Sequence, residues 1–351
     1  MRICIVGAGL TGLTLAYLLK KQGIQAILLE ARNRIGGRIH TNYQKDKAPI
    51  ELGATWLGSK HLHINKLLQV LPLEIFQQQL GDHAIYEYLS TSPPQLVQLP
   101  LNQNPSFRIK GGTFRLIEQL AKELEPNQIL LNQVITQIDS SKSGCIIRTD
   151  SNRYTADLVV TTLPPNLLVH QIDFIPALPN ELVQLAKQTH TWMGESIKVA
   201  FRFQHAFWKE ANLSGTIMSN VGPVGEMYDH ANVEGTAFAL KGFLNSSFHT
   251  MSKAERKLLV VNQLKKYYQE AFDESSEYLE CVWRQEPYTF TSYEDNIFPH
   301  QNNGHPSFRL PYMDGKLLIA GSETAKAFPG YMDGAVQSAY EVYHTILEKV
   351  G

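Results

Sequence analysis

Residues 3–12 read ICIVGAGLTG, an apolar run that leads into a G-x-G-x-x-G turn. The apolar run is typical of a buried parallel strand, and residues 13–22 carry apolar side chains at helical spacing until Gly23 stops the pattern. A second predicted strand, residues 25–29, ends on Glu30. This order of strand, glycine turn, helix, strand and acid predicts a dinucleotide-binding unit.

Each glycine of the turn has a separate physical task. Gly7 permits the tight turn, Gly9 lets the backbone approach a pyrophosphate, and Gly12 lets helix and strand pack closely. The helix N-terminus offers free N–H groups to the phosphates, and Glu30 can accept hydrogen bonds from a ribose. A plain glycine-rich turn, or a secretory signal peptide after Arg2, would explain neither the second strand nor its acid.

Residues 30–38, EARNRIGGR, extend the unit with a second glycine pair and fixed cations. Such an extension suits a longer, buried cofactor whose pyrophosphate needs another positive partner, with Arg32, Gly37 and Arg38 as contacts. Here the sequence resembles the flavin-containing amine oxidase family, whose pattern is G-x-G-x-x-G-L, E-A-R and G-G-R. Carotene and porphyrin oxidoreductases share this pattern, so it points to FAD more firmly than to any substrate.

The composition is that of an ordinary globular protein. The chain has 351 residues, of which 43% are hydrophobic and 19% charged, and its net charge of −1 provides no basic surface for nucleic acid. Three scattered cysteines, Cys4, Cys145 and Cys281, fit a reducing compartment and form no disulfide or metal pattern. No apolar run reaches the length of a membrane span. We expect a soluble cytoplasmic protein without a membrane anchor.

The resemblance implies an α/β fold with two interleaved parts. One is a Rossmann-like, glutathione-reductase-like FAD-binding domain over residues 1–60, 107–187 and 286–351. The other is an α+β substrate domain over residues 61–106 and 188–285.

The resemblance also implies further contacts with the flavin. Small residues after position 52 would let the backbone pass along the ring, although Trp56 could equally be an ordinary core side chain. Val134 would touch the adenine, and plain core packing is compatible with that role. A helix beginning near Met332 would direct its N-terminus at the end of the isoalloxazine where negative charge builds on reduction. These additional cofactor residues are Ala54, Thr55, Trp56, Val134, Glu323 and Met332.

Residues 195–203 alternate in polarity, which predicts a two-faced strand with Lys198 on its polar face. On a random strand such a lysine would be solvated. Residues 193–198, MGESIK, and the following Phe207-Trp208 match a family stretch whose lysine reaches the flavin N5 through a bound water. The resemblance thus assigns Lys198 to the reaction of reduced flavin with O₂, because an ammonium stabilises developing negative charge.

Two tyrosines fall on motif positions of the amine-oxidising members. Tyr293 and Tyr331 would flank the substrate nitrogen and form a slot of two aromatic faces. With fifteen tyrosines in the chain, either alone could be a core or surface residue. Ser292 stands where some members carry a cysteine that bonds covalently to FAD, so we expect tight but non-covalent binding.

The middle of the chain departs from the family. Residues 80–104 look irregular, and the segment between Trp56 and Gly111 is much shorter than the helical insertion usual there, which predicts a more open pocket. His61 and His63 lack a third ligand at useful spacing, which disfavours a metal site. The remaining strands are expected at 129–138, 145–149 with 153–155, 157–163, 214–220, 236–244, 278–284 and 317–319, and the helices at 113–124, 252–272 and 332–348.

The predicted activity is FAD-dependent oxidation of a primary or secondary amine to an imine and then an aldehyde, with O₂ reduced to hydrogen peroxide. The partners are therefore a small amine and O₂, and a homodimer is left open. A polyamine oxidase would also fit the frame, although the histidine those enzymes carry after E-L-G-A-T-W is replaced by Leu57-Gly58. An L-amino-acid oxidase would need a cation such as Arg202 or Arg284 for the carboxylate. A dehydrogenase or desaturase on the same fold, and a flavin-bound partner module without turnover, stay open as well.

Overall fold

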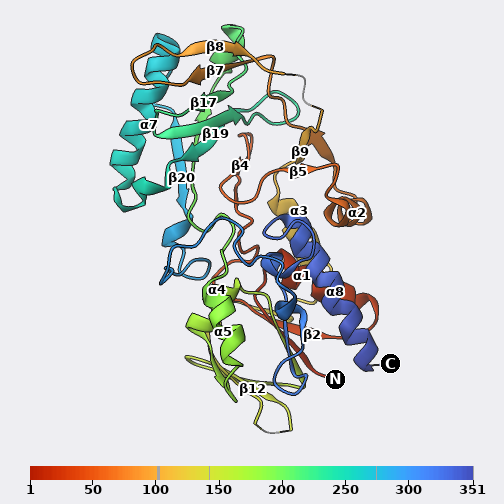
Figure 1. Ribbon diagram of the computed structural model, residues 1–351. Helices are drawn as coiled ribbons and strands as arrows, with labels where there is room; N and C mark the ends of the chain where they lie inside the picture. The colour runs from red at the N-terminus through yellow and green to blue at the C-terminus, as the bar shows by residue number, and fades with distance from the viewer. Residues whose placement is uncertain (101–102, 142, 274, 351) are drawn as a thin grey trace.

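A five-stranded parallel sheet forms the centre of one half of the molecule in the computed structural model, which describes residues 1–100, 103–141, 143–273 and 275–350. Strand β1 pairs in parallel with β2 on one side and with β14 on the other. In sheet order the strands are β10 (Ile129–Leu130), β2 (Ala26–Leu29), β1 (Ile3–Val6), β14 (Leu158–Thr161) and β21 (Leu317–Ile319). Both chain ends lie at this half of the molecule (Figure 1).

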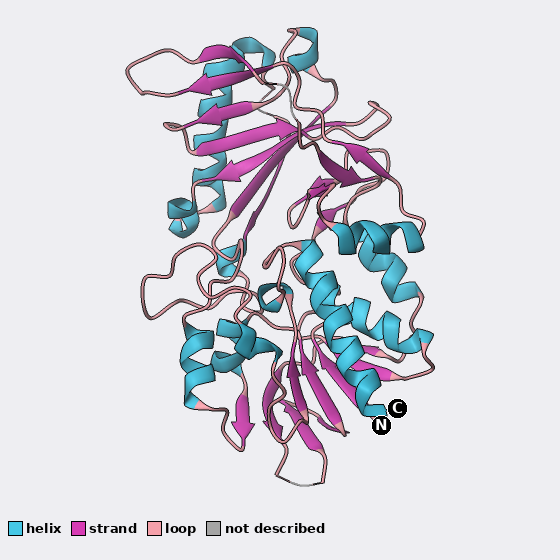
Figure 2. Ribbon diagram, turned by 45° about the vertical axis from the view of Figure 1, so that its right-hand side comes forward, coloured by secondary structure: helices cyan, strands magenta, loops and turns pink. Residues whose placement is uncertain are grey.

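Helices lie against one face of this sheet (Figure 2), and four helices share the core on that side. Alternate residues of β1, Ile3 and Ile5, pack into the core shared with these helices, because successive strand side chains point to opposite faces. The helices are α1 (Leu10–Lys21), α2 (Leu62–Val70), α3 (Phe114–Lys122) and α8 (Met332–Val350).

A second sheet covers the opposite face and completes three layers. Cys4 and Val6 of β1 pack here against Ile138 and Ile147. The sheet order is β13 (Arg153–Ala156), β12 (Cys145–Thr149), β11 (Ile135–Asp139) and β15 (Asp173–Ile175). Two short helices, α4 (Pro165–Gln171) and α5 (Asn180–Lys187), lie beside it.

A seven-stranded sheet with helix α7 (Lys253–Tyr268) forms the other half of the molecule (Figure 1). Ser252 and Glu255 close the start of α7 with a capping box, and Val260 and Leu264 pack against the apolar face of β16. In sheet order the strands are β20 (Glu277–Val282), β16 (Ile197–Phe203), β19 (Phe238–Leu244), β18 (Val224–Asp229), β17 (Ile217–Ser219), β7 (His83–Glu87) and β8 (Gln95–Gln98).

Short elements connect the two halves. The small strands are β3 (Thr41–Asn42) paired with β4 (Ile50–Glu51), and β5 (Leu57–Gly58), β9 (Ser106–Ile109) and β6 (Ile75–Gln77) in one three-stranded sheet. The single-turn helices are α6 (Phe207–Glu210), η1 (Ser246–Thr250), η2 (Gln269–Ala271), η3 (Trp283–Gln285), η4 (Pro306–Arg309) and η5 (Ser322–Thr324).

The predicted strand at 129–138 is wrong in one respect, because it divides into β10 and β11, which belong to different sheets. Asn132 between them has a left-handed backbone with φ of 57°, which ends the extended run. Asn132 N–H donates to Arg32 O and Gln133 N–H to Glu30 O. These bonds place the turn next to the end of β2.

The prediction that residues 80–104 are irregular is wrong for 83–87 and 95–98, and residues 101–102 lie outside the described ranges. Strands β7 and β8 form an antiparallel pair there, and β7 extends the seven-stranded sheet by pairing with β17. The exposed strand β8 has little apolar alternation, so its sequence carries a weak strand signal. Strand β18 and helices α4 and α5 were not predicted at all.

Helix α2 packs with the half of the molecule that the predicted domain division does not assign it to. The predicted boundary assigns residues 61–106 to the substrate domain, but Ile64, Leu67 and Leu68 pack into the core around α1 and α8.

Among the helices in the described ranges, none has the length and hydropathy needed to cross a bilayer.

Candidate active site and cofactor cavity

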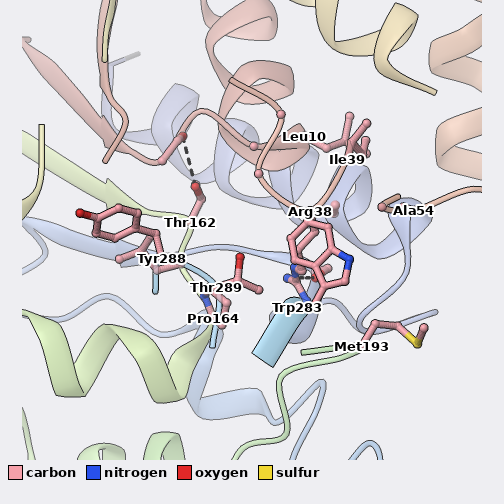
Figure 3. A pocket seen from close by; sticks show the side chains of 18 of the residues that line it. Leu10, Arg38, Ile39, Ala54, Thr162, Pro164, Met193, Trp283, Tyr288 and Thr289 are labelled. Atoms are coloured by element: carbon pink, nitrogen blue, oxygen red, sulfur yellow. Dashed lines mark hydrogen bonds between the residues drawn. The ribbon is translucent and has the colours of Figure 1, made fainter. Parts of the chain in front are cut away.

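A cavity of about 680 Å³ runs between the two halves of the molecule. The carboxyl ends of β1 and β2 form one end, and β16, β18 and β19 form the other. In Figure 3, Thr162, Tyr288 and Thr289 lie on one side of this space and Arg38 and Trp283 on the other. Segments far apart in the chain therefore converge on a single space.

The two glycine turns pack directly against each other at the first end. Gly36 N–H donates to Ala8 O at 2.8 Å, and a Cβ on Gly9 would lie 3.9 Å from the Cα of Gly37. A Cβ on Gly12 would lie 2.1 Å from the carbonyl oxygen of Gly7, so only glycine fits there. No side chain caps the first turn of α1, and no acid occupies it. The helix N-terminus is thus available for an anionic ligand.

Glu30 fixes the loop as well as facing the cavity. Its carboxylate accepts hydrogen bonds from Ala8 N–H at 2.8 Å and from Arg32 N–H at 3.0 Å. Gln133 and Val134 line the cavity beside it. The predicted ribose acid and adenine neighbour therefore lie together.

Arg38 is held by a carboxylate that is itself fully buried. Its guanidinium donates to both oxygens of Glu323, at 2.5 and 2.8 Å, and to Ser322 Oγ at 2.8 Å. Burial alone would lower the pKa of Arg38, but Glu323 outweighs it and the pKa is raised. Burial would raise the pKa of Glu323, and Arg38 outweighs this effect and lowers it. Arg38 lines the cavity, whereas Glu323, which the resemblance assigns to the cofactor, is not among the cavity-lining residues and instead holds Arg38 in place.

Arg32 is anchored on the opposite side of the cavity. It donates to Glu286 at 3.2 Å and to Thr289 Oγ1 at 2.7 Å. Both predicted arginines thus contribute to the wall with their positions fixed.

The segment after β4 forms the wall at the second end. Gly53, Ala54, Thr55 and Trp56 all line the cavity. Trp56 donates through Nε1 to Gln78 at 3.1 Å, which holds its ring. Ala54, Thr55 and Trp56, the three predicted flavin neighbours in this segment, therefore all belong to the cavity wall, and their contact with a flavin stays a prediction.

Lys198 lines the cavity and is only 4% exposed. Its ammonium donates to Gly53 O. Burial lowers the pKa of Lys198 to about 8, with Glu51 opposing the effect. The alternative interpretation of Lys198 as a solvated surface lysine is therefore wrong, because the polar face of β16 points into the molecule.

A row of three side chains crosses the sheet at Lys198. The strand register places Phe243 opposite Lys198, and Glu226 opposite Phe243. All three line the cavity, and Tyr228 Oη donates to Glu226 at 2.5 Å. Glu226 and Phe243 were not predicted as site residues, because their place beside Lys198 depends on the pairing of β16, β19 and β18 and not on the pattern within one strand.

The two predicted tyrosines lie in different surroundings. Tyr331 lines the cavity with 37% of its surface exposed, and its ring centroid lies 5.4 Å from that of Trp192. Tyr293 is not among the cavity-lining residues, and its hydroxyl accepts a hydrogen bond from Thr191 N–H at 2.8 Å. The structure thus brings Tyr331 and Trp192 together at the wall, and not the predicted pair.

Helix α8 begins at the cavity with Met332, as the sequence predicts. Its first turn contains Asp333, whose carboxylate accepts from Ile64 N–H at 2.8 Å and lies 3.2 Å from His63 Nδ1. His63 therefore joins α2 to α8. No group of three potential metal ligands occurs within the described residues.

The cavity fits the FAD predicted from the sequence. The uncapped helix N-terminus, the facing glycine turns and Glu30 suit the adenosine and pyrophosphate, and the aromatic end with Lys198 suits the flavin ring. The three cysteines are free and buried, and none of them lines the cavity. A thioether to the flavin therefore has no donor at this wall.

The sequence pattern of the flavin-containing amine oxidoreductases matches residues 10–103 and 86–342. The match divides where the resemblance predicts a shortened segment. A probable flavin-containing monoamine oxidase A of Dictyostelium discoideum is 24% identical over 453 aligned positions, covering 99% of this chain and 98% of that protein. The flavin-containing amine oxidase A of Sus scrofa is 23% identical, covering 99% of this chain and 85% of the relative. These alignments are longer than the chain, so the relatives carry segments that it lacks.

Two solved structures are similar over nearly their whole length. A putrescine oxidase bound to putrescine has a TM-score of 0.85 at 22% identity, with 99% of each chain covered. A cyclohexylamine oxidase from Brevibacterium oxydans has a TM-score of 0.85 at 20% identity, again with 99% of each chain covered. The two halves of this molecule and their order along the chain are therefore shared with known folds.

Proposed function

The chain belongs to the flavin-containing amine oxidoreductase family, and from this premise we propose that it oxidises a primary or secondary amine with bound FAD. The amine becomes an imine, which water converts to an aldehyde or ketone, and O₂ becomes hydrogen peroxide. One observation carries the proposal: the glycine turns, the Arg38–Glu323 pair and Lys198 all meet at a single cavity. FAD supplies the redox chemistry, and the protein supplies position, desolvation and charge.

The residues of the chain divide these tasks. The first turn of α1 and Glu30 would hold the nucleotide end of FAD, and residues 53–56 would lie along its ring. Lys198 would provide a cation at the flavin end of the cavity, where an ammonium stabilises developing negative charge on O₂. Tyr331 and Trp192 form an aromatic wall at the partly exposed entrance, which favours an approaching amine.

The charges at the wall favour a substrate with a second cationic group. Arg202 is engaged by Glu277 and Arg284 by Glu195, and neither arginine lines the cavity, which disfavours an amino-acid oxidase. Glu226 does line it, about 10 Å along the sheet from Lys198, since neighbouring strands lie almost 5 Å apart. We therefore favour a diamine or polyamine over a simple monoamine.

An anaerobic titration of the yellow protein tests the proposal. Phenethylamine, putrescine, spermine and several L-amino acids are added in turn, and bleaching of the visible flavin band is recorded. Air is then admitted and peroxide is measured. We expect putrescine or spermine to bleach the flavin at the lowest concentration and peroxide to form as the colour returns.

The Glu226→Gln variant tests the substrate preference separately. We expect a 10- to 100-fold rise in KM for diamines, with little change for phenethylamine, because only the distal ammonium loses its partner. An equal rise in KM for both amines would contradict the role of Glu226.

In the anaerobic titration, bleaching without reoxidation in air would support a dehydrogenase, and no bleaching by any amine would support a module without turnover.

The cellular compartment and the assembly are further parts of this proposal. Three unpaired, buried cysteines support a reducing compartment such as the cytoplasm. The homodimer stays a prediction, which sedimentation of the purified protein tests.

A further inference from the structure

A second buried lysine lies beside Lys198. In the register of β16 and β19, Lys198 faces Phe243, and Lys241 occupies the same strand as Phe243 two residues earlier. Residues two apart on a strand point to the same face, so Lys198 and Lys241 are diagonal neighbours on one side of the sheet. Their ammonium nitrogens lie 5.0 and 4.7 Å from the centroid of the same Phe243 ring.

Lys241 is buried beside one hydroxyl and two aromatic faces, which attract an ammonium but do not replace the carboxylate partner that a buried charge requires. Its side chain is completely buried, and its Nζ donates to Thr55 Oγ1 at 3.0 Å and lies 3.8 Å from the centroid of Trp56. Among the described residues, no carboxylate lies within 4.0 Å of either lysine nitrogen, so neither forms an ion pair. Two unpaired charges side by side would be strongly destabilising, since Lys241 is fully buried, Lys198 is only 4% exposed, and the two ammonium groups repel each other.

The pKa values follow this arrangement. Burial lowers the pKa of Lys241 well below its usual range, and the charge of Lys198 lowers it further. Burial also lowers the pKa of Lys198, while a hydrogen bond with Lys241 raises it. The ionisable groups that face this pair from the surrounding elements are Glu51 of β4, Glu226 and Tyr228 of β18, His230 after β18 and Cys281 of β20, and Arg108 of β9 acts on His230.

We propose that Lys198 and Lys241 share a single proton, with Lys241 uncharged and acting as a positioning residue that accepts a hydrogen bond from the Lys198 ammonium. Lys241 does not line the cavity, so it acts through Lys198. The two lysines also hold the segment from Gly53 to Trp56 through separate bonds. The pair keeps one cation at a fixed place on the cavity wall, and its use there rests on the proposed function.

Proton uptake on unfolding tests the proposal without any turnover. The free energy of unfolding of the FAD-loaded protein is measured in urea between pH 6.5 and 7.5, for the wild type and for Lys241→Met. The slope against pH gives the number of protons taken up on unfolding. We expect the wild type to take up about one proton more than Lys241→Met, because an uncharged lysine becomes an ammonium in the unfolded chain. The exposed Lys253→Met is the matched control, and we expect no change in the slope.

Equal proton uptake in the wild type and Lys241→Met would overturn the proposal, because Lys241 would then be charged in the folded protein. If Lys241→Met does not fold, NMR of the wild-type protein labelled with ¹⁵N-lysine tests the proposal instead. We expect one side-chain nitrogen signal of an uncharged amine at pH 7, and only ammonium signals would overturn the proposal.

The pH dependence of flavin reoxidation provides a second measurement, which a purely structural role of Lys241 would not change. The flavin is reduced with dithionite, so that no amine is needed, and its reoxidation in air is followed against pH. Loss of an uncharged acceptor lowers the pKa of Lys198, so we expect the midpoint to fall in Lys241→Met. A rise in the midpoint would mean that a positive charge had been removed, and would overturn the proposal. If no amine is turned over but the proton count changes as expected, the proposed function fails and the lysine pair stands.

Discussion

At the scale of the residue, Lys198 has the most direct consequence for the reaction. The Lys198→Met variant keeps the size of the side chain but removes the cation that the cavity wall presents. We expect FAD to stay bound and its reoxidation by O₂ to slow by about 100- to 1,000-fold, as for the loss of one electrostatic donor. Stopped-flow mixing of the reduced protein with O₂ measures this rate. Reoxidation at the wild-type rate would show that O₂ does not depend on this ammonium.

The pH dependence should differ between the two substrates. An alkylamine with a pKa of about 10.4 is mostly protonated at pH 7, so kcat/KM for the amine should rise with pH up to about 9.5. Because the pKa of Lys198 is about 8, kcat/KM for O₂ should fall above that pH as the ammonium loses its proton. Steady-state rates with each substrate varied in turn separate the two effects. A flat amine profile between pH 7 and 9.5 would contradict the need for a neutral amine.

At the scale of the element, the turn between β1 and α1 depends on close backbone contact. A Cβ in the Gly12→Ala variant would lie 2.1 Å from Gly7 O, so the helix must move away from the strand. We expect loss of FAD binding and a free energy of unfolding lower by about 2 kcal/mol or more. Gly58→Ala is the matched control, because a Cβ there meets no atom within 4 Å. Flavin absorbance and urea unfolding compare them, and equal behaviour would contradict the steric argument.

Helix α7 is fixed to the seven-stranded sheet by a buried ion pair. Arg256 of α7 donates to both oxygens of Glu280 on β20, at 2.6 and 3.0 Å, and both side chains are less than 10% exposed. We expect Arg256→Met to lower the free energy of unfolding by about 3 kcal/mol, because Glu280 would stay buried without a partner. Lys20→Met breaks an exposed pair with Glu125 and should cost less than about 1 kcal/mol. Similar losses in both variants would contradict this ranking.

At the scale of the whole molecule, the cavity joins the two halves. Strands β1 and β2 contribute to one end and β16, β18 and β19 to the other, so FAD that fills the cavity would contact both halves. FAD at one hundred times its Kd should raise the free energy of unfolding by about 2.7 kcal/mol. Hydrogen exchange should show added protection in peptides from both β1 and β16. Protection confined to β1 would show that the seven-stranded sheet does not take part in binding.

The sequence by itself determined the parts that depend on short-range spacing. The glycine turn, the strand and helix beside it, Glu30 and the second glycine pair lie within 36 residues, so their geometry follows from local backbone rules. The resemblance extended the predicted site to Lys198, and the alternation of residues 195–203 indicated that Lys198 lies on the polar face of its strand.

Only the tertiary structure decided what surrounds Lys198. Phe243 and Lys241 come next to it, and Glu226 lies one strand further on, through the register of antiparallel strands, which depends on pairing between distant segments and not on local spacing. The position of Tyr293 away from the cavity wall likewise depends on its contact with Thr191, a residue about one hundred positions earlier. A period-two pattern indicates that a strand has two different faces. Only the packed molecule shows which face is shielded from solvent and which charged groups meet there.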